Sequence, residues 1–169
     1  MTAPELFWVP GPWRGRLAVS TRPRGGDWLE DEVRAWHRAG VDIVVSLLEQ
    51  AESEQLDLHQ EQTLAETNGL RFLSFPIPDR GVPSSAKAAV QLLKDLTHAL
   101  EQGKHVAVHC RQGVGRSGLI AAGALVASGA TPEAALQTVS SARGLTVPET
   151  PEQRRWVEQL PVDHPLVTR

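Results

Sequence analysis

The fold of this chain is decided by residues 105–118, which read His105-Val106-Ala107-Val108-His109-Cys110-Arg111-Gln112-Gly113-Val114-Gly115-Arg116-Ser117-Gly118. The run around Val106 and Val108 is apolar and β-branched, which predicts a buried strand. The glycines that follow indicate a loop. The alanine-rich apolar segment from Arg116 to Ser128 then predicts a buried helix. We therefore expect a strand, a tight loop and a helix in direct succession.

The same alternation of strands and helices extends in both directions from this stretch. Further strands are expected at 17–19, 41–48 and 70–75. Serine, threonine and aspartate at helix starts, and glycine or proline at their usual flanking positions, mark the helices. These helices are expected from Asp27 (with Glu30 completing a capping box) to Gly40, over 49–68, from Ser84 or Ser85 to about Gln102, from Thr131 and from Thr150. An irregular tail is expected from Pro161.

Strands that alternate with helices predict an α/β fold, here a single domain over 1–169 with a central, mainly parallel sheet flanked by helices. In such sheets, ligands bind beyond the carboxyl ends of the strands. That rule points to the loops after Ser20, Leu48, Phe75 and His109.

Composition narrows the class of protein. The 169 residues are 41% hydrophobic and 22% charged, with a net charge of −3, which gives no general reason to expect nucleic-acid binding. A single cysteine excludes a disulfide within the chain and fits a reducing cytoplasm. No apolar run approaches membrane-spanning length, and residues 1–5 lack the pattern of a signal peptide. We therefore expect a cytoplasmic protein without a membrane partner.

The loop after His109 has the composition of an anion site. Glycines let backbone amides turn inward, and the start of the following helix adds a partial positive charge. The backbone from Arg111 to Gly115, through Gln112, Gly113 and Val114, would bind phosphate oxygens together with the planar guanidinium of Arg116. A free thiol is only about 3% ionised at neutral pH. Such surroundings lower a thiol pKa to roughly 3.5–7.5, which would make Cys110 a nucleophile rather than a buried small hydrophobe.

The segment His109-Cys110-x5-Arg116-Ser117-Gly118 resembles the signature of the protein tyrosine phosphatase superfamily, particularly its small dual-specificity-like members. Over residues 6–160 the resemblance implies a phosphocysteine mechanism without metal or organic cofactor. It implies that Asp79, in Pro78-Asp79-Arg80-Gly81, is the general acid. It also implies that His109 orients the loop and tunes the thiol, and that Ser117 donates to the departing sulfur. Gln153 resembles the glutamine that positions hydrolytic water, although it could equally cap its own helix.

The expected substrate is therefore a phosphorylated protein or peptide, with phosphotyrosine first and phosphoserine or phosphothreonine also considered. The alternatives are an inositol or lipid phosphatase and a non-catalytic phosphate-binding module. Arg22 or Arg24 would line the mouth of the pocket and favour acidic flanking residues, if their strand is parallel to the cysteine strand. Glu49, Glu52 and Glu54 are expected on a solvated helix face, and His105 is expected to be structural. One of Trp8, Trp13 or Trp28 could border the substrate.

Overall fold

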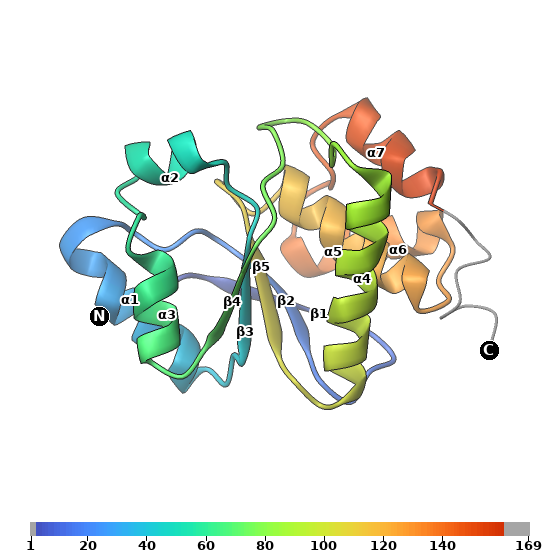
Figure 1. The fold of residues 1–169 in the computed structure, drawn as a ribbon. Helices are drawn as coiled ribbons and strands as arrows, with labels where there is room; N and C mark the ends of the chain where they lie inside the picture. The colour runs from blue at the N-terminus through green and yellow to red at the C-terminus, as the bar shows by residue number, and fades with distance from the viewer. Residues whose placement is uncertain (1–2, 161–169) are drawn as a thin grey trace.

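The computed structural model describes residues 3–160 and contains one five-stranded sheet (Figure 1). Its strands lie in the order β1-β2-β5-β3-β4, and β5 is the central one. The strands β2 to β5 run parallel, whereas β1 pairs antiparallel with β2 at one edge. The predicted mainly parallel α/β fold is thus confirmed. The strand bounds are β1 (Leu6–Val9), β2 (Leu17–Ser20), β3 (Ile43–Ser46), β4 (Arg71–Ser74) and β5 (Val106–His109).

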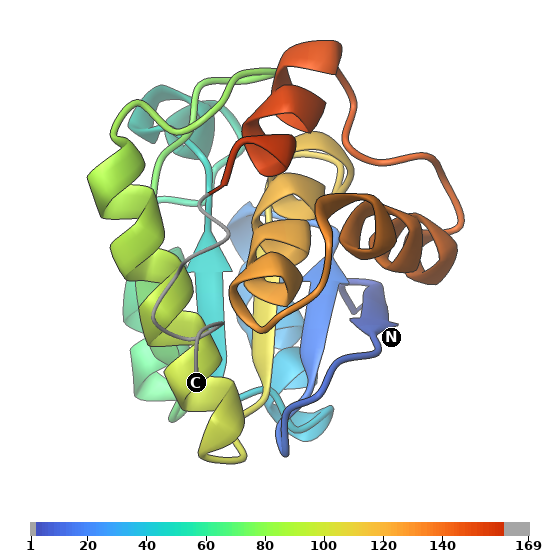
Figure 2. The same cartoon turned by 90° about the vertical axis from the view of Figure 1, so that its right-hand side faces the viewer.

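Helices cover both faces of the sheet, and the period-2 alternation of each strand provides an apolar surface for both. On β5, Val106 and Val108 belong to one core cluster and Ala107 to the other. The first face is covered by α4 (Ala86–Glu101), α5 (Gly115–Ala127) and α6 (Pro132–Arg143), and α7 (Pro151–Glu158) packs on α5, as Figure 2 shows. The second face packs against α1 (Leu29–Arg38) and α3 (Glu61–Thr67). The short helix α2 (Gln50–Gln55) lies at the end of the sheet where β3 finishes (Figure 1).

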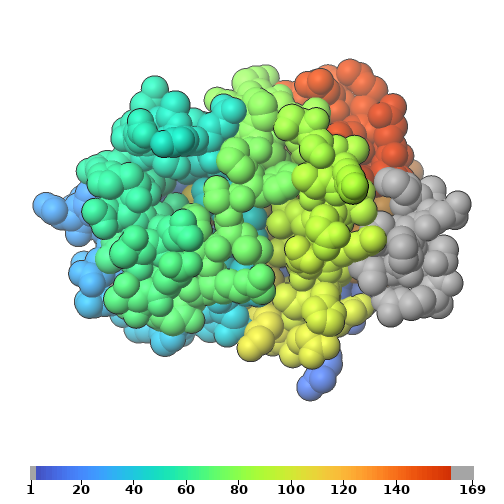
Figure 3. Space-filling model, in the orientation of Figure 1, coloured from blue at the N-terminus to red at the C-terminus, as the bar shows by residue number. Residues whose placement is uncertain are grey.

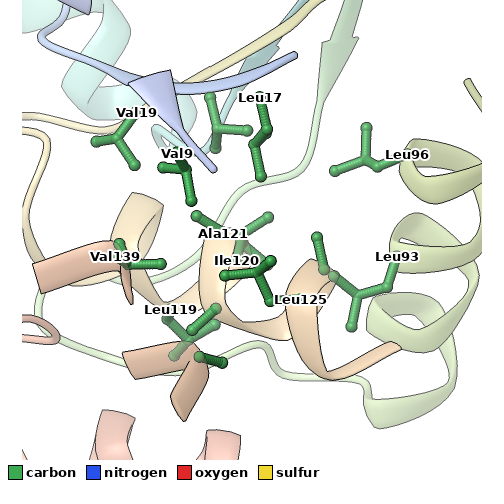
Figure 4. Close-up of a cluster of buried hydrophobic side chains, with 14 of the residues drawn as sticks. Val9, Leu17, Val19, Leu93, Leu96, Leu119, Ile120, Ala121, Leu125 and Val139 are labelled. Carbon is green, nitrogen blue, oxygen red and sulfur yellow. The ribbon is translucent and has the colours of Figure 1, made fainter. Parts of the chain in front are cut away.

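The helix α5 is the centre of the larger core. All 13 of its residues are buried, so it is apolar on every side, as its alanine-rich sequence predicted. In Figure 4 its side chain Ile120 lies between the strand residue Leu17 and Leu93 of helix α4, and Leu119 lies on the side of Val139 from α6. Small residues allow this close approach: a Cβ on Gly123 would lie 3.1 Å from Leu93 Cδ1. The core therefore fixes where α5 begins.

Several predicted helix starts are confirmed in atomic detail. Ser85 caps α4 by accepting from the backbone N–H of Ala88 at 3.1 Å, and Thr131 caps α6 in the same way. Thr150 and Gln153 form a capping box at α7. In the part of the chain that the structure describes, no helix is long and apolar enough to cross a membrane. The irregular tail expected from Pro161 lies outside the described residues.

Two predictions of local structure were wrong, and one strand was missed. Asp27 does not cap a helix; it lies inside a 3-10 turn, Gly26–Trp28, and α1 begins only at Leu29. The segment 49–68 is two helices, because Asp57 adopts a left-handed φ of 57° and the chain turns to bury Leu58. The edge strand β1 was not predicted at all. All four of its residues, Leu6-Phe7-Trp8-Val9, are apolar, so the sequence shows no alternation there, although only Val9 is fully buried.

Truncating a side chain in the α5 layer should destabilise the protein strongly. Leu96 of α4 is 1% exposed and packs in the cluster of Figure 4. We expect Leu96→Ala to lower the free energy of unfolding by about 2–5 kcal/mol, since the lost contacts leave a cavity. Urea denaturation measures this. The matched control Leu145→Ala, at a side chain 48% exposed, should change it by less than about 0.5 kcal/mol. Equal losses in both variants would contradict this account of the core.

Candidate active site

Four loops meet at the carboxyl-terminal end of the sheet, because the parallel strands β2, β3 and β5 end in register there. Ser20, Ser46 and His109 are register partners at the ends of β2, β3 and β5. The loop after β4 crosses above them, where the backbone N–H of Ile77 donates to the carbonyl of Leu47 at 3.0 Å. In Figure 3 this loop, coloured green, lies at the top between α2 and α7. The predicted convergence of these loops is thus confirmed.

A cavity of about 140 Å³ opens at this end of the sheet, and three segments that are far apart in the sequence form its walls. Its lining comprises Asp79, Arg80, Cys110, Arg111, Gln112, Gly115, Arg116 and Glu149. A larger hollow of about 580 Å³ lies at the opposite end of the strands, where β3 and β4 begin, beside Asp42, Arg71 and His98. The larger hollow holds no nucleophile, so the smaller cavity is the candidate active site.

The thiol of Cys110 lies at the base of this cavity and is 3% exposed. Its Sγ is 3.1 Å from Ser117 Oγ. Burial raises the pKa of the Cys110 thiol, but hydrogen bonds from the Ser117 side chain and from the backbone N–H groups of Ser117 and Gly113, with the charge of Arg116, lower it more. The pKa of this thiol therefore lies below its ordinary value, and the thiolate is favoured.

Two glycines of the loop are required by the space around them. Gly113 has a φ of +73°, and a Cβ there would lie 3.0 Å from the carbonyl oxygen of Ser20. A Cβ on Gly115 would lie 3.0 Å from oxygens of both Glu149 and Gln153. Arg143, which sequence reasoning did not single out, holds the loop from outside by donating to the carbonyls of Gly113 at 2.7 Å and Gln112 at 3.2 Å.

The guanidinium of Arg116 is the electrostatic centre of the site and is only 2% exposed. Its Nη1 donates to Glu52 Oε1 at 2.7 Å and to the carbonyl of Ile77 at 2.9 Å. Its Nη2 donates to Glu52 Oε2 at 3.0 Å and to Asp79 Oδ1 at 3.2 Å. Arg116 therefore connects the cysteine loop to the segments after β3 and after β4.

The expectation that Glu52 lies on a solvated helix face was wrong. Glu52 is 8% exposed, whereas Glu54 on the same helix is exposed. The α2 start turns Glu52 inward: Oε1 accepts from the backbone N–H of Glu49 at 3.0 Å in a capping box. Burial raises the pKa of Glu52, but hydrogen bonds from Arg116, Glu49 and Arg111 and the charge of Arg116 lower it more, so it is ionised. The three-residue spacing from Glu49 to Glu52 is that of a capping box, and it was the sequence signal that could have predicted the inward orientation of Glu52.

The loop that carries Asp79 is fastened to the segment before α7. Arg80 Nη1 lies 3.4 Å from Glu149 Oε2, and Gln153 Nε2 donates to the carbonyl of Gly81 at 2.9 Å. The other end of the Gln153 amide accepts from the backbone N–H groups of Glu149 and Thr150. The Gln153 side chain thus caps α7 and tethers the Asp79 loop, and its positioning of water stays a prediction.

The expectation that Arg22 or Arg24 lines the mouth is not met, although β2 is parallel to β5 as it required. Arg24 Nε is paired with Glu32 Oε2 at 3.0 Å, and Arg22 donates to the carbonyl of Pro23. Besides the buried Arg116, the basic residues that line the cavity are Arg80 and Arg111. The cavity lining includes none of the tryptophans considered, and His105 is structural, accepting from the backbone N–H of Arg16 at 3.0 Å.

Comparison with known proteins identifies the family. The family model described as "Polymorphic toxin system, DSP-PTPase phosphatase" matches residues 19–130. The chain belongs to this phosphatase family. The chain is also 27% identical over 158 residues to "Putative tyrosine phosphatase 197R" of Invertebrate iridescent virus 6, a match that covers 91% of this chain and 56% of the viral protein. A 58-residue stretch, 34% of the chain, is 45% identical to "Protein tyrosine phosphatase domain-containing protein 1" of Mus musculus, of which it covers 8%. The chain thus spans about half, or less, of the length of these relatives.

Solved structures share the architecture. Tk-PTP in its active form superimposes with a TM-score of 0.71 at 31% identity, over 92% of this chain and 93% of that chain. Kinase associated phosphatase gives a TM-score of 0.86 at 19% identity, with 94% of both chains covered. PTPMT1 in complex with PI(5)P gives a TM-score of 0.74 at 19% identity, over 95% of this chain and 97% of that chain. The last two establish the fold alone.

The bidentate pair between Glu52 and Arg116 generates a prediction about pH and stability. A carboxylate whose pKa is lower in the folded than in the unfolded chain contributes stability above the unfolded pKa, and this contribution is lost as pH falls through the folded pKa. We expect Glu52→Gln to lower the free energy of unfolding at pH 7 by about 1–3 kcal/mol. The difference from the wild type should shrink as pH falls below about 4.3, the usual value for glutamate.

Denaturation by urea across this pH range measures the effect, and Glu54→Gln on the same helix is the matched control. A pH-independent difference for Glu52→Gln, or an equal one for Glu54→Gln, would show that the carboxylate charge of Glu52 does not stabilise the loop.

Proposed function

We propose that this phosphatase hydrolyses phosphate monoesters on proteins, phosphotyrosine above all, through a phosphocysteine formed on Cys110. The observation that carries the proposal is the Arg116 guanidinium, which lies beside the buried thiol and also contacts the carboxylate of Asp79. Nucleophile, phosphate-binding cation and proton donor thus surround one small cavity. We further propose that residues 1–169 act as a single phosphatase domain in the cytoplasm, where the lone thiol stays reduced.

In the first step the Cys110 thiolate attacks phosphorus, and the bond from phosphorus to the leaving oxygen breaks. Asp79, protonated, gives its proton to that oxygen. The backbone N–H groups from Arg111 to Gly115 and the guanidinium of Arg116 hold the phosphoryl oxygens while charge develops on them. Because Asp79 contacts Arg116 in the free protein, the incoming phosphate replaces one carboxylate contact with its own.

In the second step water attacks the phosphocysteine and gives a proton to Asp79. The bond from sulfur to phosphorus breaks, and the thiolate leaves with Ser117 Oγ–H donating to it, which fits their 3.1 Å separation. Inorganic phosphate is released and the resting thiolate returns. No metal or organic cofactor takes part in this proposal, since each proton and electron pair is accounted for by the substrate, water and these side chains.

The charges at the mouth favour a protein monoester over the alternative of an inositol or lipid phosphate. Arg80 is paired with Glu149, and Arg111 lies 3.4 Å from Glu52, so neither is left as a free cation for a second phosphate. A non-catalytic binding module is a weaker reading, because the thiol, the guanidinium and the carboxylate are all in place.

Replacing the nucleophile tests the mechanism. We expect Cys110→Ser to abolish turnover of p-nitrophenyl phosphate and of a phosphotyrosine peptide while keeping the fold, because the hydroxyl stays protonated. The control Ser117→Ala should keep the thiol and turn over more slowly. Comparing kcat/KM for phosphotyrosine, phosphoserine and phosphothreonine peptides and for inositol phosphates then tests the substrate class. Turnover by Cys110→Ser above a few per cent, or a preference for inositol phosphates, would overturn the corresponding part of the proposal.

Replacing the general acid tests the first step. We expect Asp79→Asn to lose roughly 10²–10⁴-fold in kcat with an alkyl phosphate, because an amide cannot give a proton to the leaving oxygen. Steady-state rates test this, and Glu149→Gln, at another carboxylate in the cavity wall, is the control. An unaltered kcat in Asp79→Asn would assign the proton to another residue.

A further inference from the structure

A second buried carboxylate stands behind the cysteine loop and has no part in the mechanism above. Glu61, the first residue of α3, has a side chain only 3% exposed. Its Oε2 lies 2.6 Å from Nε2 of His109, whose ring is wholly buried. The other ring nitrogen, Nδ1, is 3.2 Å from the carbonyl oxygen of Cys110. Glu61 is therefore linked to the nucleophile through one imidazole.

The geometry specifies how the imidazole is protonated. A carbonyl oxygen only accepts, so Nδ1 carries a proton toward Cys110. An ionised carboxylate also only accepts, so with Glu61 ionised the 2.6 Å contact places a second proton on Nε2. Burial lowers the pKa of His109, but the charge of Glu61 and hydrogen bonds to Glu61 and to the Cys110 carbonyl raise it more. The geometry and the direction of this pKa shift together favour an imidazolium paired with a carboxylate.

Among the groups around the His109 ring, Glu61 is the one whose charge most favours the second proton. From α1 the ring meets the neutral Trp36, stacked with centroids 5.7 Å apart, and the Trp36 indole N–H donates to Ser20 Oγ of β2 at 3.1 Å. Within residues 3–160, the titratable groups that face the ring are Glu61 from α3 and the Cys110 thiol from the loop. Without the carboxylate, a wholly buried imidazole would be neutral.

We infer that Glu61 is a positioning residue for the nucleophile: its carboxylate keeps His109 doubly protonated, which fixes the Cys110 carbonyl and stabilises the neighbouring thiolate. The inference rests on the proposed role of Cys110 as nucleophile. Glu61 touches neither substrate nor sulfur, and acts only through His109. Glu61 contacts Nε2, whereas Nδ1 is the ring nitrogen beside Cys110 and the charge of Cys110 acts on the ring, so the imidazolium favours the charged form of the sulfur.

The test separates charge from shape. In Glu61→Gln, the amide can still hydrogen-bond to Nε2, but the charge that holds the second proton is gone. We expect the midpoint of Cys110 ionisation to move up by roughly one pH unit, which is about tenfold less thiolate below the midpoint. The rate of alkylation by iodoacetamide against pH measures it, in protein whose folding is verified by circular dichroism at each pH. Below the midpoint, kcat/KM should fall by the same factor and recover at higher pH.

Two further variants make the outcome decisive. Glu61→Asp keeps the charge, and should keep the midpoint near that of the wild type. Glu32→Gln removes another buried carboxylate, 2% exposed and paired with Arg24, and should leave the midpoint unchanged. An unchanged midpoint in Glu61→Gln, or equal shifts in Glu61→Gln and Glu32→Gln, would overturn the inference. Alkylation reports on the thiol without turnover, so a wild-type protein that fails to hydrolyse phosphate monoesters would refute the proposed function but not this link.

Discussion

The structure depends above all on the burial of one guanidinium. A buried cation is costly unless its donors find acceptors, and both terminal nitrogens of Arg116 find them in two separate segments: Glu52 after β3, and the Ile77 carbonyl and Asp79 after β4. Satisfying Arg116 therefore also assembles the site, because the loops after β3, β4 and β5 must converge on it. The same hydrogen bonds to Arg116 therefore stabilise the fold and shape the cavity.

The core supplies the rigidity that this arrangement needs. Because α5 is buried on every side, its amino end cannot shift without disturbing the layers around it. The loop before it is confined as well, by the close approach of Gly113 to Ser20 and by Arg143 from outside. The thiol thus sits in a frame whose backbone amides are already oriented before any substrate arrives.

Features encoded by neighbours in sequence were predictable, and features encoded by distant partners were not. The strand, glycine loop and helix around Cys110 have local signals, as do the caps at Ser85, Thr131 and Thr150. Glu52 and Glu61 lie in a polar stretch that resembles any solvated helix. Their partners, Arg116 and His109, are 64 and 48 residues away in the chain, so only the assembled sheet edge reveals the pairs. The interruption between α2 and α3 at Asp57 likewise accompanies the burial of Leu58, which no local sequence pattern predicts.

The absence of a second cysteine from this chain has a consequence for the oxidation of Cys110. A thiolate favoured by its surroundings is readily oxidised to a sulfenic acid, which many proteins protect by closing a disulfide to a nearby second cysteine. Cys110 is the one cysteine among the 169 residues, so this chain holds no such partner. Recovery from peroxide then depends on a sulfenamide with a backbone nitrogen or on an external thiol such as glutathione. The duration of any oxidative inactivation would accordingly be governed by the reducing capacity of the surroundings.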